Sequence, residues 1–322
     1  MSEPSPPAKD GPSTFADGVR LAIGTLSVFP VRPGAIDRRA GGIAMAVAPL
    51  VGAVIGAVGG LVLAISLWLG MTSLPASVLA VAVVALLTRG LHLDGLADLA
   101  DGLGSGKPAE RALEIMKRSD IGPFGVVTLI FVLLIQVTAL REAVTCAGAG
   151  TGTITLVAAC AAGRLALTWA CRTGIPPARP DGLGAMVAGT VRRSVAVAVT
   201  VLVLAGTAAL VYLHDIGALD LWSSGSPSES SGWGYMAYVD VTHSEVGDLL
   251  GTGSTGAGLI SGLGPLLTPL GLPLAMLVGL LAAWAVRRRA VRRLGGVTGD
   301  VLGALVEITT ATTLLTCTIL VN

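Results

Sequence analysis

Three aspartates stand at helical spacing in the stretch "GLHLDGLADLADGLG". Asp94, Asp98 and Asp101 are four and three residues apart, so on a helix they share one face. Carboxylates stacked in this way repel one another unless a cation lies between them. Hard oxygen ligands suit Mg²⁺, which commonly takes one or two carboxylates together with phosphate oxygens and water. The stretch therefore predicts a metal site that also binds a phosphate-bearing substrate.

The residues between and before the aspartates refine this prediction. His92 flanks them, and we expect it either to transfer a proton or to bind a phosphate. Gly95 and Gly102 are expected to leave room for a bulky ligand beside the backbone. A solvated acidic helix end is the alternative, but the preceding run "PASVLAVAVVALL" is apolar, and a charge within hydrocarbon costs ~3 kcal/mol. We therefore predict catalytic roles for His92, Asp94 and Asp98.

A second cluster follows in "RRLGGVTGDVLGALVE". Asp300 and Glu307 are seven residues apart and share a helical face. The preceding "GGVTG" is expected to form a tight turn whose amides point at an anion near a helix N-terminus. This predicts phosphate-binding roles for Gly295, Gly296 and Thr298.

Together the two clusters predict one divalent-metal and pyrophosphate-binding cavity. The predicted metal ligands are the five acids Asp94, Asp98, Asp101, Asp300 and Glu307. For Glu307 an alternative stays open: a structural carboxyl inside the membrane that is satisfied by Thr309 or Thr310.

Three cations are candidates for phosphate binding. Arg111 and Lys117 follow the first cluster and are expected to clamp phosphates, although they would equally serve only to set the membrane topology. Arg164 lies inside the apolar stretch "AACAAGRLALTWAC", where an unpaired cation is costly, so a carboxylate or phosphate partner is expected. The basic, Gly- and Pro-rich loop 172–193 is expected to close over a ligand.

The elements that must position these residues are membrane helices. The chain has 322 residues, of which 53% are hydrophobic and only 13% charged, with a mean hydropathy of +0.80. Soluble domains carry about twice that charged fraction, and a helical span needs about 20 apolar residues. We predict an all-α polytopic membrane protein whose seven spans lie near 43–69, 74–90, 124–141, 152–172, 194–213, 266–286 and 300–320. The segment 15–30 is expected to lie at the membrane interface.

Charge distribution predicts the orientation. Of the 21 Lys and Arg residues, 19 fall in segments that the predicted spans place on one side of the membrane. The loop 214–265, on the opposite side, has none and carries six acids. By the positive-inside rule, the N-terminus and the aspartates face the cytoplasm and the 214–265 insertion is external. The polar, Pro-rich residues 1–14 are expected to be a disordered tail, and 15–322 a single domain in the cytoplasmic membrane.

Four blocks, in order, resemble the cobalamin synthase family, the adenosylcobinamide-GDP ribazoletransferases. They are "GLHLDGLADLADGL", "ALEIMKRSDIGPFG", "DGLGAMVAG" and "LGGVTGDVLGALVE", and the resemblance covers nearly the whole chain apart from the tail and the 214–265 loop. It implies a Mg²⁺-dependent membrane enzyme of late vitamin B12 assembly. That enzyme joins adenosylcobinamide-GDP to α-ribazole or its 5′-phosphate, releasing GMP and forming adenosylcobalamin or its 5′-phosphate. A ribose 5′-hydroxyl, or its phosphate, would attack the cobinamide-side phosphorus.

The resemblance also implies residue roles. The metal and pyrophosphate would be bound by Asp94, Asp98, Asp101 and Asp300, supported by His92 and Glu307, with His92 or a free carboxylate as the base. The chain departs from the family where "MKRSDIG" replaces a pattern close to "MKDSRIG". Arg and Asp are thereby exchanged between positions 118 and 120, which puts a ligand role for either in doubt. Thr310 also stands where a second acid often follows.

Two other function classes share some of these features. Intramembrane acids and glycine-broken helices also mark cation-coupled transporters, and CDP-alcohol phosphotransferases share the carboxylate chemistry. The expected partners are the two small-molecule substrates and the lipid bilayer, with no nucleic acid. Self-association, or association with other cobalamin-assembly enzymes, is left open.

Overall fold

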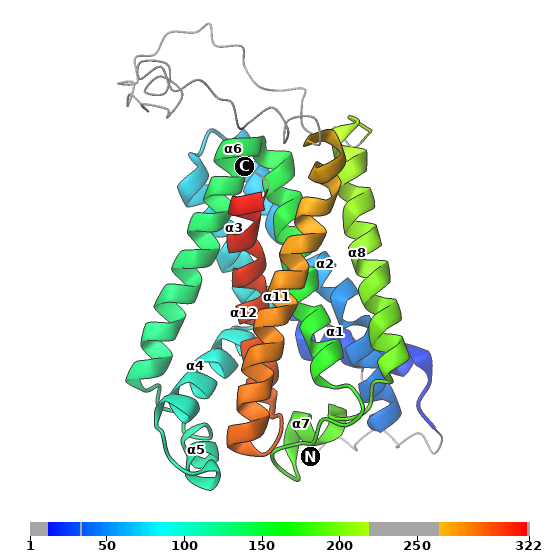
Figure 1. The fold of residues 1–322 in the computed structure, drawn as a ribbon, viewed down its shortest axis with the longest axis vertical. Coiled ribbons are helices and arrows are strands. Elements are labelled where there is room, and N and C mark those ends of the chain that lie inside the picture. The colour runs from blue at the N-terminus through cyan, green and yellow to red at the C-terminus, as the bar shows by residue number, and fades with distance from the viewer. Residues whose placement is uncertain (1–11, 33, 219–263, 321–322) are drawn as a thin grey trace, which may run out of the picture.

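The structure, a computed structural model, describes residues 12–32, 34–218 and 264–320. Within these ranges the chain is helical and forms no strand beyond two isolated bridges, which confirms the all-α class (Figure 1). The helices are α1 (Phe15–Leu26), α2 (Arg38–Trp68), α3 (Ser73–Leu87), α4 (Leu91–Gly104), α5 (Ala109–Ile115), α6 (Pro123–Ala170), α7 (Gly182–Val187), α8 (Arg193–Asp215), α11 (Gly264–Leu294) and α12 (Gly299–Leu320). Most of the 214–265 loop lies outside the described residues.

Several of these helices are long and apolar enough to cross a membrane. Among the described residues five qualify alone, namely α2, α6, α8, α11 and α12, and a sixth if α3 and α4 form one bent span. The predicted spans 124–141 and 152–172 both lie in α6, which is broken at Gly148 (φ 83°, ψ 176°). Figure 1 shows α6 running up the bundle and returning beside itself. The polytopic membrane class is confirmed, whereas the count of seven stays a prediction.

A stripe of small residues packs α2 against the second half of α6. Gly52, Gly56 and Gly60 recur every fourth residue and therefore share one face of α2. A Cβ on Gly56 would lie 2.7 Å from the Cα of Val157, and one on Gly52 would meet the carbonyl oxygen of Cys160. Close approach of this kind through glycine is a typical packing mode of membrane helices, as the glycine-rich composition predicts.

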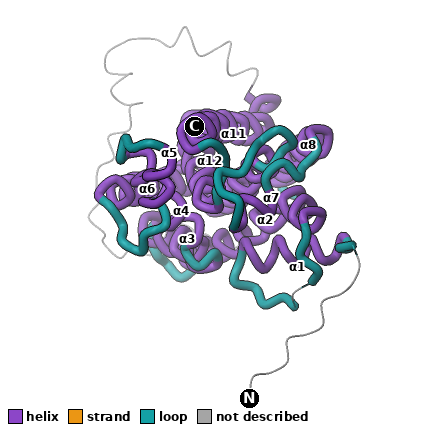
Figure 2. Tube along the Cα trace, turned by 90° about the horizontal axis from the view of Figure 1, so that it is seen from below, coloured by secondary structure: helices purple, strands orange, loops and turns teal. Residues whose placement is uncertain are grey.

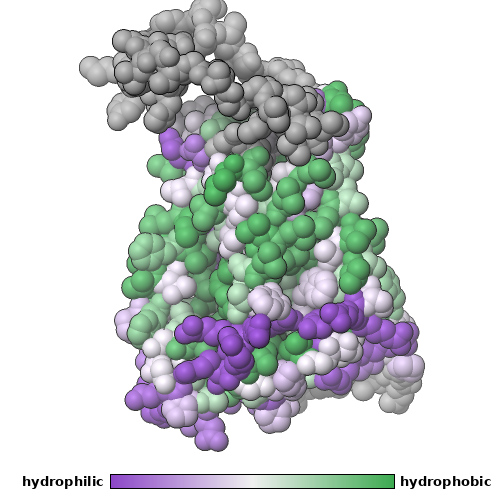
Figure 3. Space-filling view, in the orientation of Figure 1, coloured by the Kyte–Doolittle hydropathy of each residue, from purple (hydrophilic) through white to green (hydrophobic). Residues whose placement is uncertain are grey.

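The chain turns sharply between α3 and α4. Arg89 and Gly90 both have left-handed backbone (φ 55° and 67°), and α4 then runs at 87° to α3. As a result α4 crosses the lower end of the bundle, where α5 and α7 also lie (Figures 1 and 2). Figure 3 shows hydrophilic surface gathered at that end below a broad hydrophobic zone. The predicted functional segments therefore share one end of the molecule.

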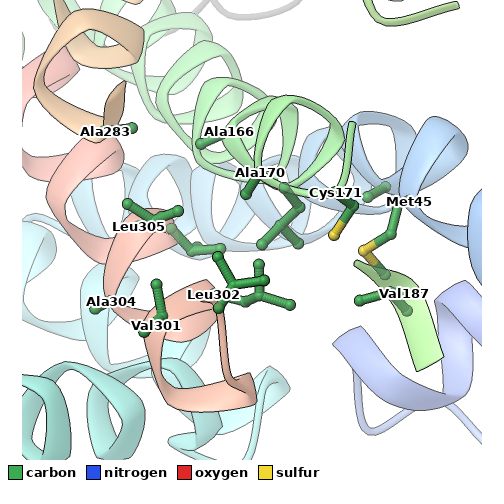
Figure 4. Packing of buried hydrophobic residues seen from close by; sticks show 14 of the residues in the cluster. Met45, Ala166, Ala170, Cys171, Val187, Ala283, Val301, Leu302, Ala304 and Leu305 are labelled. Atoms are coloured by element: carbon green, nitrogen blue, oxygen red, sulfur yellow. The ribbon is translucent and has the colours of Figure 1, made fainter. Parts of the chain in front are cut away.

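A hydrophobic cluster supports this end from inside. Ala166 and Ala170 of α6 lie close to Leu302 and Leu305 of α12, with Met45 of α2 on the far side (Figure 4). All five are buried. The first turns of α12 are consequently fixed by packing against two long helices before any ligand binds.

The described chain begins with a well-ordered N-terminal cap. The Ser13 hydroxyl donates to Asp37 at 2.6 Å, and Thr14 forms a capping box with Asp17 at the start of α1. The carboxylate of Asp37 also accepts from the Ala40 amide at the start of α2; that bond, with those from Ser13, lowers the pKa of Asp37 to about 2. Of the predicted tail, residues 1–11 lie outside the described part, while Ser13 and Thr14 are held in place.

Candidate active site

A cavity of about 290 Å³ lies where α4, α12 and the loop before α7 meet. Residues from α1, α2 and α6 complete its wall. Its polar lining consists of Thr25, His92, Asp94, Arg179, Asp181, Thr298 and Asp300. The cavity thus brings together both acidic clusters that the sequence singled out.

Helices α4 and α12, which both line the cavity, cross with their backbones in contact. A Cβ on Gly95 would lie 2.8 Å from the carbonyl oxygen of Asp300, and one on Gly303 would lie 3.1 Å from the Cα of His92. The prediction that Gly95 and Gly102 leave room for a ligand is therefore wrong. Helix α12 occupies the space beside Gly95, and the side chain of Met116 occupies the space beside Gly102.

Three carboxylates meet across this helix crossing. Asp94 and Asp300 line the cavity, and half-buried Asp98 lies within electrostatic range of both. In the part of the chain that the structure describes, no three His, Cys, Asp or Glu side chains form a ready metal site. Asp94 and Asp300 in the lining, with Asp98 close to both, therefore make a partial ligand set.

Asp101, the third aspartate of the first cluster, does not line the cavity. One of its carboxylate oxygens accepts from the Gly122 amide at 2.7 Å and the other from the Gly125 amide at 3.0 Å. These amides belong to the start of α6, where helical backbone N–H groups have no intrahelical acceptor. Asp101 thus caps α6 and anchors α4 to it.

Glu307 also lies away from the cavity, deeper in the bundle. Seven residues along a helix correspond to a rise of ~10 Å from Asp300. Glu307 is 8% exposed and accepts from the side-chain amide of Gln136 at 2.8 Å. The alternative partners considered from the sequence are not used, because the hydroxyls of Thr309 and Thr310 bond to backbone carbonyls. Glu307 is thus a hydrogen-bonded interior carboxyl.

The cation in the cavity wall is one that the sequence did not single out. Arg179 approaches Asp300 at 3.8 Å and donates to the carbonyl of Leu113 at 2.7 Å. It comes from the basic loop that was expected to close over a ligand, but nothing in the sequence separates it from the other arginines there. Arg111 and Lys117 are exposed and do not line the cavity.

The turn before α12 packs against the loop before α7 and contributes one of its predicted phosphate-binding residues to the cavity. Gly295 has φ 84°, which favours glycine, and Gly296 packs against the backbone of Pro177, where a side chain would clash. The Val297 amide is used by the Pro176 carbonyl. Of the predicted phosphate-binding residues in this turn, Thr298 alone lines the cavity.

Thr298 also caps α12. Its hydroxyl accepts from the Val301 amide and donates to the Asp300 carboxylate, each at 3.2 Å. The first turn of α12, including Gly299, is thereby directed at the cavity. A helix N-terminus in this position favours an anion.

Arg164 is buried directly behind His92. It is 1% exposed, its Nη2 lies 3.4 Å from the Nδ1 of His92, and its Nη1 donates to the Cys160 carbonyl at 3.5 Å. Its Nε has no hydrogen-bond partner. The predicted carboxylate partner is not found: within the described residues, no acid forms an ion pair with Arg164.

Residues 18–318 match the family described as cobalamin-5-phosphate synthase. The chain belongs to this family. It is 40% identical over 306 residues to the adenosylcobinamide-GDP ribazoletransferase of Frankia casuarinae, covering 92% of each chain. It is 35% identical over 292 residues to that of Bradyrhizobium diazoefficiens, with 89% of this chain and 87% of the relative covered. No solved structure matches.

The family assignment confirms the resemblance seen in the sequence blocks. It also sets aside the transporter and CDP-alcohol phosphotransferase alternatives, because the match covers nearly the whole chain. The exchanged pair Arg118 and Asp120 is exposed and does not line the cavity. Both positions thus lie outside the wall that carries the carboxylates.

Proposed function

We propose that the chain transfers the cobinamide phosphate of adenosylcobinamide-GDP to α-ribazole or its 5′-phosphate, releasing GMP. The family match and the names of the relatives support this reaction. One structural observation supports its location: the crossing of α4 and α12 brings Asp94 and Asp98 to Asp300, with Arg179 opposite. Carboxylates facing a cation and a helix N-terminus are the groups that a metal-bound diphosphate requires.

The partial ligand set fits Mg²⁺. This ion usually binds through one or two carboxylates plus substrate phosphate oxygens and water, not through an all-protein cage. Asp94, Asp98 and Asp300 would hold it, whereas the carboxylate of Asp101 is directed at the amides of Gly122 and Gly125 and does not line the cavity. When bound, Mg²⁺ neutralises charge on the diphosphate oxygens.

The chain's own residues account for the remaining requirements. Arg179 donates to phosphate oxygens through N–H groups that now face Asp300, and the first turn of α12 binds a further oxygen. A carboxylate of the cluster accepts the proton from the attacking ribose hydroxyl. One P–O bond forms at the cobinamide-side phosphorus while the bond from that phosphorus to the GMP oxygen breaks.

The attacking hydroxyl is a secondary one. The family is described as producing cobalamin 5-phosphate, so the 5′ position keeps its phosphate through the reaction and is not the nucleophile. The proposal therefore replaces attack by the 5′-hydroxyl or its phosphate, expected from the sequence, with attack by a secondary hydroxyl of the ribose.

The orientation follows from the arrangement of the basic segments. Helices α4, α5 and α7, which belong to segments predicted to be cytoplasmic, lie at the lower end of the bundle (Figure 1). The cavity is lined by residues of α4 and α7 at that end. The exposed arginines of α11, including Arg288, Arg289, Arg292 and Arg293, also lie at this end, which the positive-inside rule assigns to the cytoplasm. This distribution of basic residues supports a cavity that opens toward the cytoplasm.

The test is turnover of adenosylcobinamide-GDP and α-ribazole 5′-phosphate by protein purified into liposomes. We expect release of GMP that needs Mg²⁺, is abolished by a chelator and is lost in Asp98→Asn. Asp120→Asn, an exposed acid outside the cavity, is the matched control and should keep its activity. GMP release that persists in chelator, or that Asp98→Asn retains, contradicts the proposed metal site; absence of GMP from the unaltered protein contradicts the reaction.

A further inference from the structure

The contact between Arg164 and His92 connects a residue outside the cavity to one in its wall. His92 lines the cavity and is 3% exposed, whereas Arg164 lies behind it among α2, α4 and α6. The stem of Arg164 packs where Gly52 has no side chain, since a Cβ there would lie 2.9 Å from its Cδ. The guanidinium therefore has little room to move away from the imidazole.

Hydrogen-bonding chemistry then determines which ring nitrogen of His92 carries the hydrogen. A guanidinium has five N–H donors, accepts nothing and stays protonated in proteins. The nitrogen that faces it, Nδ1, must therefore present a lone pair. A neutral imidazole has one donor and one acceptor nitrogen, so the hydrogen is on Nε2.

The Nε2 atom is available to a ligand. Within the described residues, no group accepts a hydrogen bond from Nε2. Nε2 is also not one of the fully buried side-chain atoms that lack a partner. Because His92 lines the cavity next to Asp94, an N–H at Nε2 reaches a bound ligand. A hydrogen bond from this N–H becomes stronger during the reaction only if it is made to an oxygen that gains negative charge.

We propose that Arg164 is a positioning residue that fixes His92 as the Nε2–H tautomer, so that His92 donates to a phosphate oxygen of the diphosphate substrate. His92 is then not the base, because its lone pair faces Arg164 and not the ribose. The proposal rests on the proposed function for the identity of the ligand, but not for the tautomer. It also explains a buried guanidinium without a carboxylate partner.

The tautomer is measured directly by nitrogen-15 NMR of histidine-labelled protein in micelles. The His92 signals are those that disappear in His92→Gln. We expect a pyrrole-type Nε2 and a pyridine-type Nδ1. The opposite tautomer, or a rapidly exchanging mixture, overturns the proposal. This readout needs no turnover, so it stands or fails separately from the assigned reaction.

Kinetics distinguish a donor from a base. Glutamine places an amide N–H near the position of Nε2 but does not accept a proton at neutral pH. We expect His92→Gln to keep kcat within about tenfold of the unaltered enzyme, whereas His92→Ala loses ~100-fold or more, as for removal of a preorganised donor. Equal losses in the two variants overturn the donor role.

A double-mutant cycle tests whether Arg164 acts through His92. Arg164→Lys keeps the charge but not the fork of donors. We expect it to lower kcat at least tenfold in the unaltered background but less than about threefold in the His92→Gln background. It should also change the His92 spectrum. Equal costs in both backgrounds indicate a purely structural arginine and overturn the proposal.

Arg287 provides the matched control. It is also a buried arginine, 6% exposed, and donates to the Trp169 carbonyl at a separate place in the bundle. Arg287→Lys should leave the His92 spectrum unchanged. A change of the His92 spectrum in Arg287→Lys equal to that in Arg164→Lys overturns the specific role of Arg164.

Discussion

Gly95 of α4 lies against the backbone of Asp300 in α12, so that a Cβ on Gly95 would be 2.9 Å from the Cα of Asp300. This contact sets the separation of the two acidic clusters. We expect Gly95→Ala to push the start of α12 away from α4 and to lower kcat/KM by ~100-fold, the cost of a misplacement near 1 Å. The measurement is steady-state GMP release at saturating Mg²⁺.

Gly102→Ala is the control on the same helix. Its added methyl would first meet the flexible side chain of Met116, and the nearest backbone atom, the carbonyl oxygen of Ala112, would be 3.3 Å away. Both substitutions raise helix propensity by ~1 kcal/mol, so they differ only in what the methyl meets. Similar activity losses in the two variants would show that the crossing at Gly95 does not control the site.

Asp101→Ala should weaken the fold more than the chemistry. Its carboxylate caps α6 through the amides of Gly122 and Gly125, and loss of an N-cap costs ~0.5–2 kcal/mol. We expect a lower midpoint of thermal unfolding in detergent, with an unchanged Mg²⁺ concentration for half-maximal activity. If that concentration rises as it does in Asp94→Asn, Asp101 is a ligand as well as a cap.

Arg179 should matter more than the cations that precede it in the chain. We expect Arg179→Gln to lower kcat/KM for adenosylcobinamide-GDP by ~100-fold, in the range for loss of one preorganised donor. Arg111→Gln removes an exposed arginine paired with Glu114 and should change activity by less than about twofold. The reverse order of effects would place the diphosphate outside the cavity, near α5.

The Gln136 and Glu307 pair should be a stability element of the bundle. Gln136→Leu leaves the buried carboxyl without its partner, which costs ~1–3 kcal/mol. Glu307→Gln keeps an acceptor for the Gln136 amide and should cost less. Unfolding in graded denaturing detergent measures both variants, and an equal loss in the two would mean that the carboxylate itself, not the hydrogen bond, stabilises this position.

The span regions were predictable because the bilayer imposes one rule on every segment. Continuous apolar runs had to be helices, and α2, α8 and α12 lie where the sequence predicts spans. The sequence predicts two separate spans where the structure has the single element α6, broken at Gly148. The position of this break was not predictable, because it depends on how the two halves of α6 pack. Likewise, the 87° turn before α4 depends on a left-handed Arg89, a conformation that no local pattern requires.

The site was predictable in composition but not in detail. Spacing correctly grouped Asp94 and Asp98 with Asp300, because helical periodicity and a shared membrane face limit the arrangement. Spacing also grouped Asp101 with them, but it did not predict that Asp101 bonds to a helix start some twenty residues further along the chain instead of lining the cavity. Arg179 was missed for the same reason: only the tertiary contact with Asp300 distinguishes it from its neighbours.

The contact between α4 and α12 also bears on when the enzyme becomes active during its synthesis. Asp94 leaves the ribosome early, whereas Asp300 belongs to the last helix that is described. A nascent chain from which α12 has not yet emerged therefore lacks one wall of the cavity and the carboxylate of Asp300. Catalytic competence therefore requires that α12 has already packed against α4.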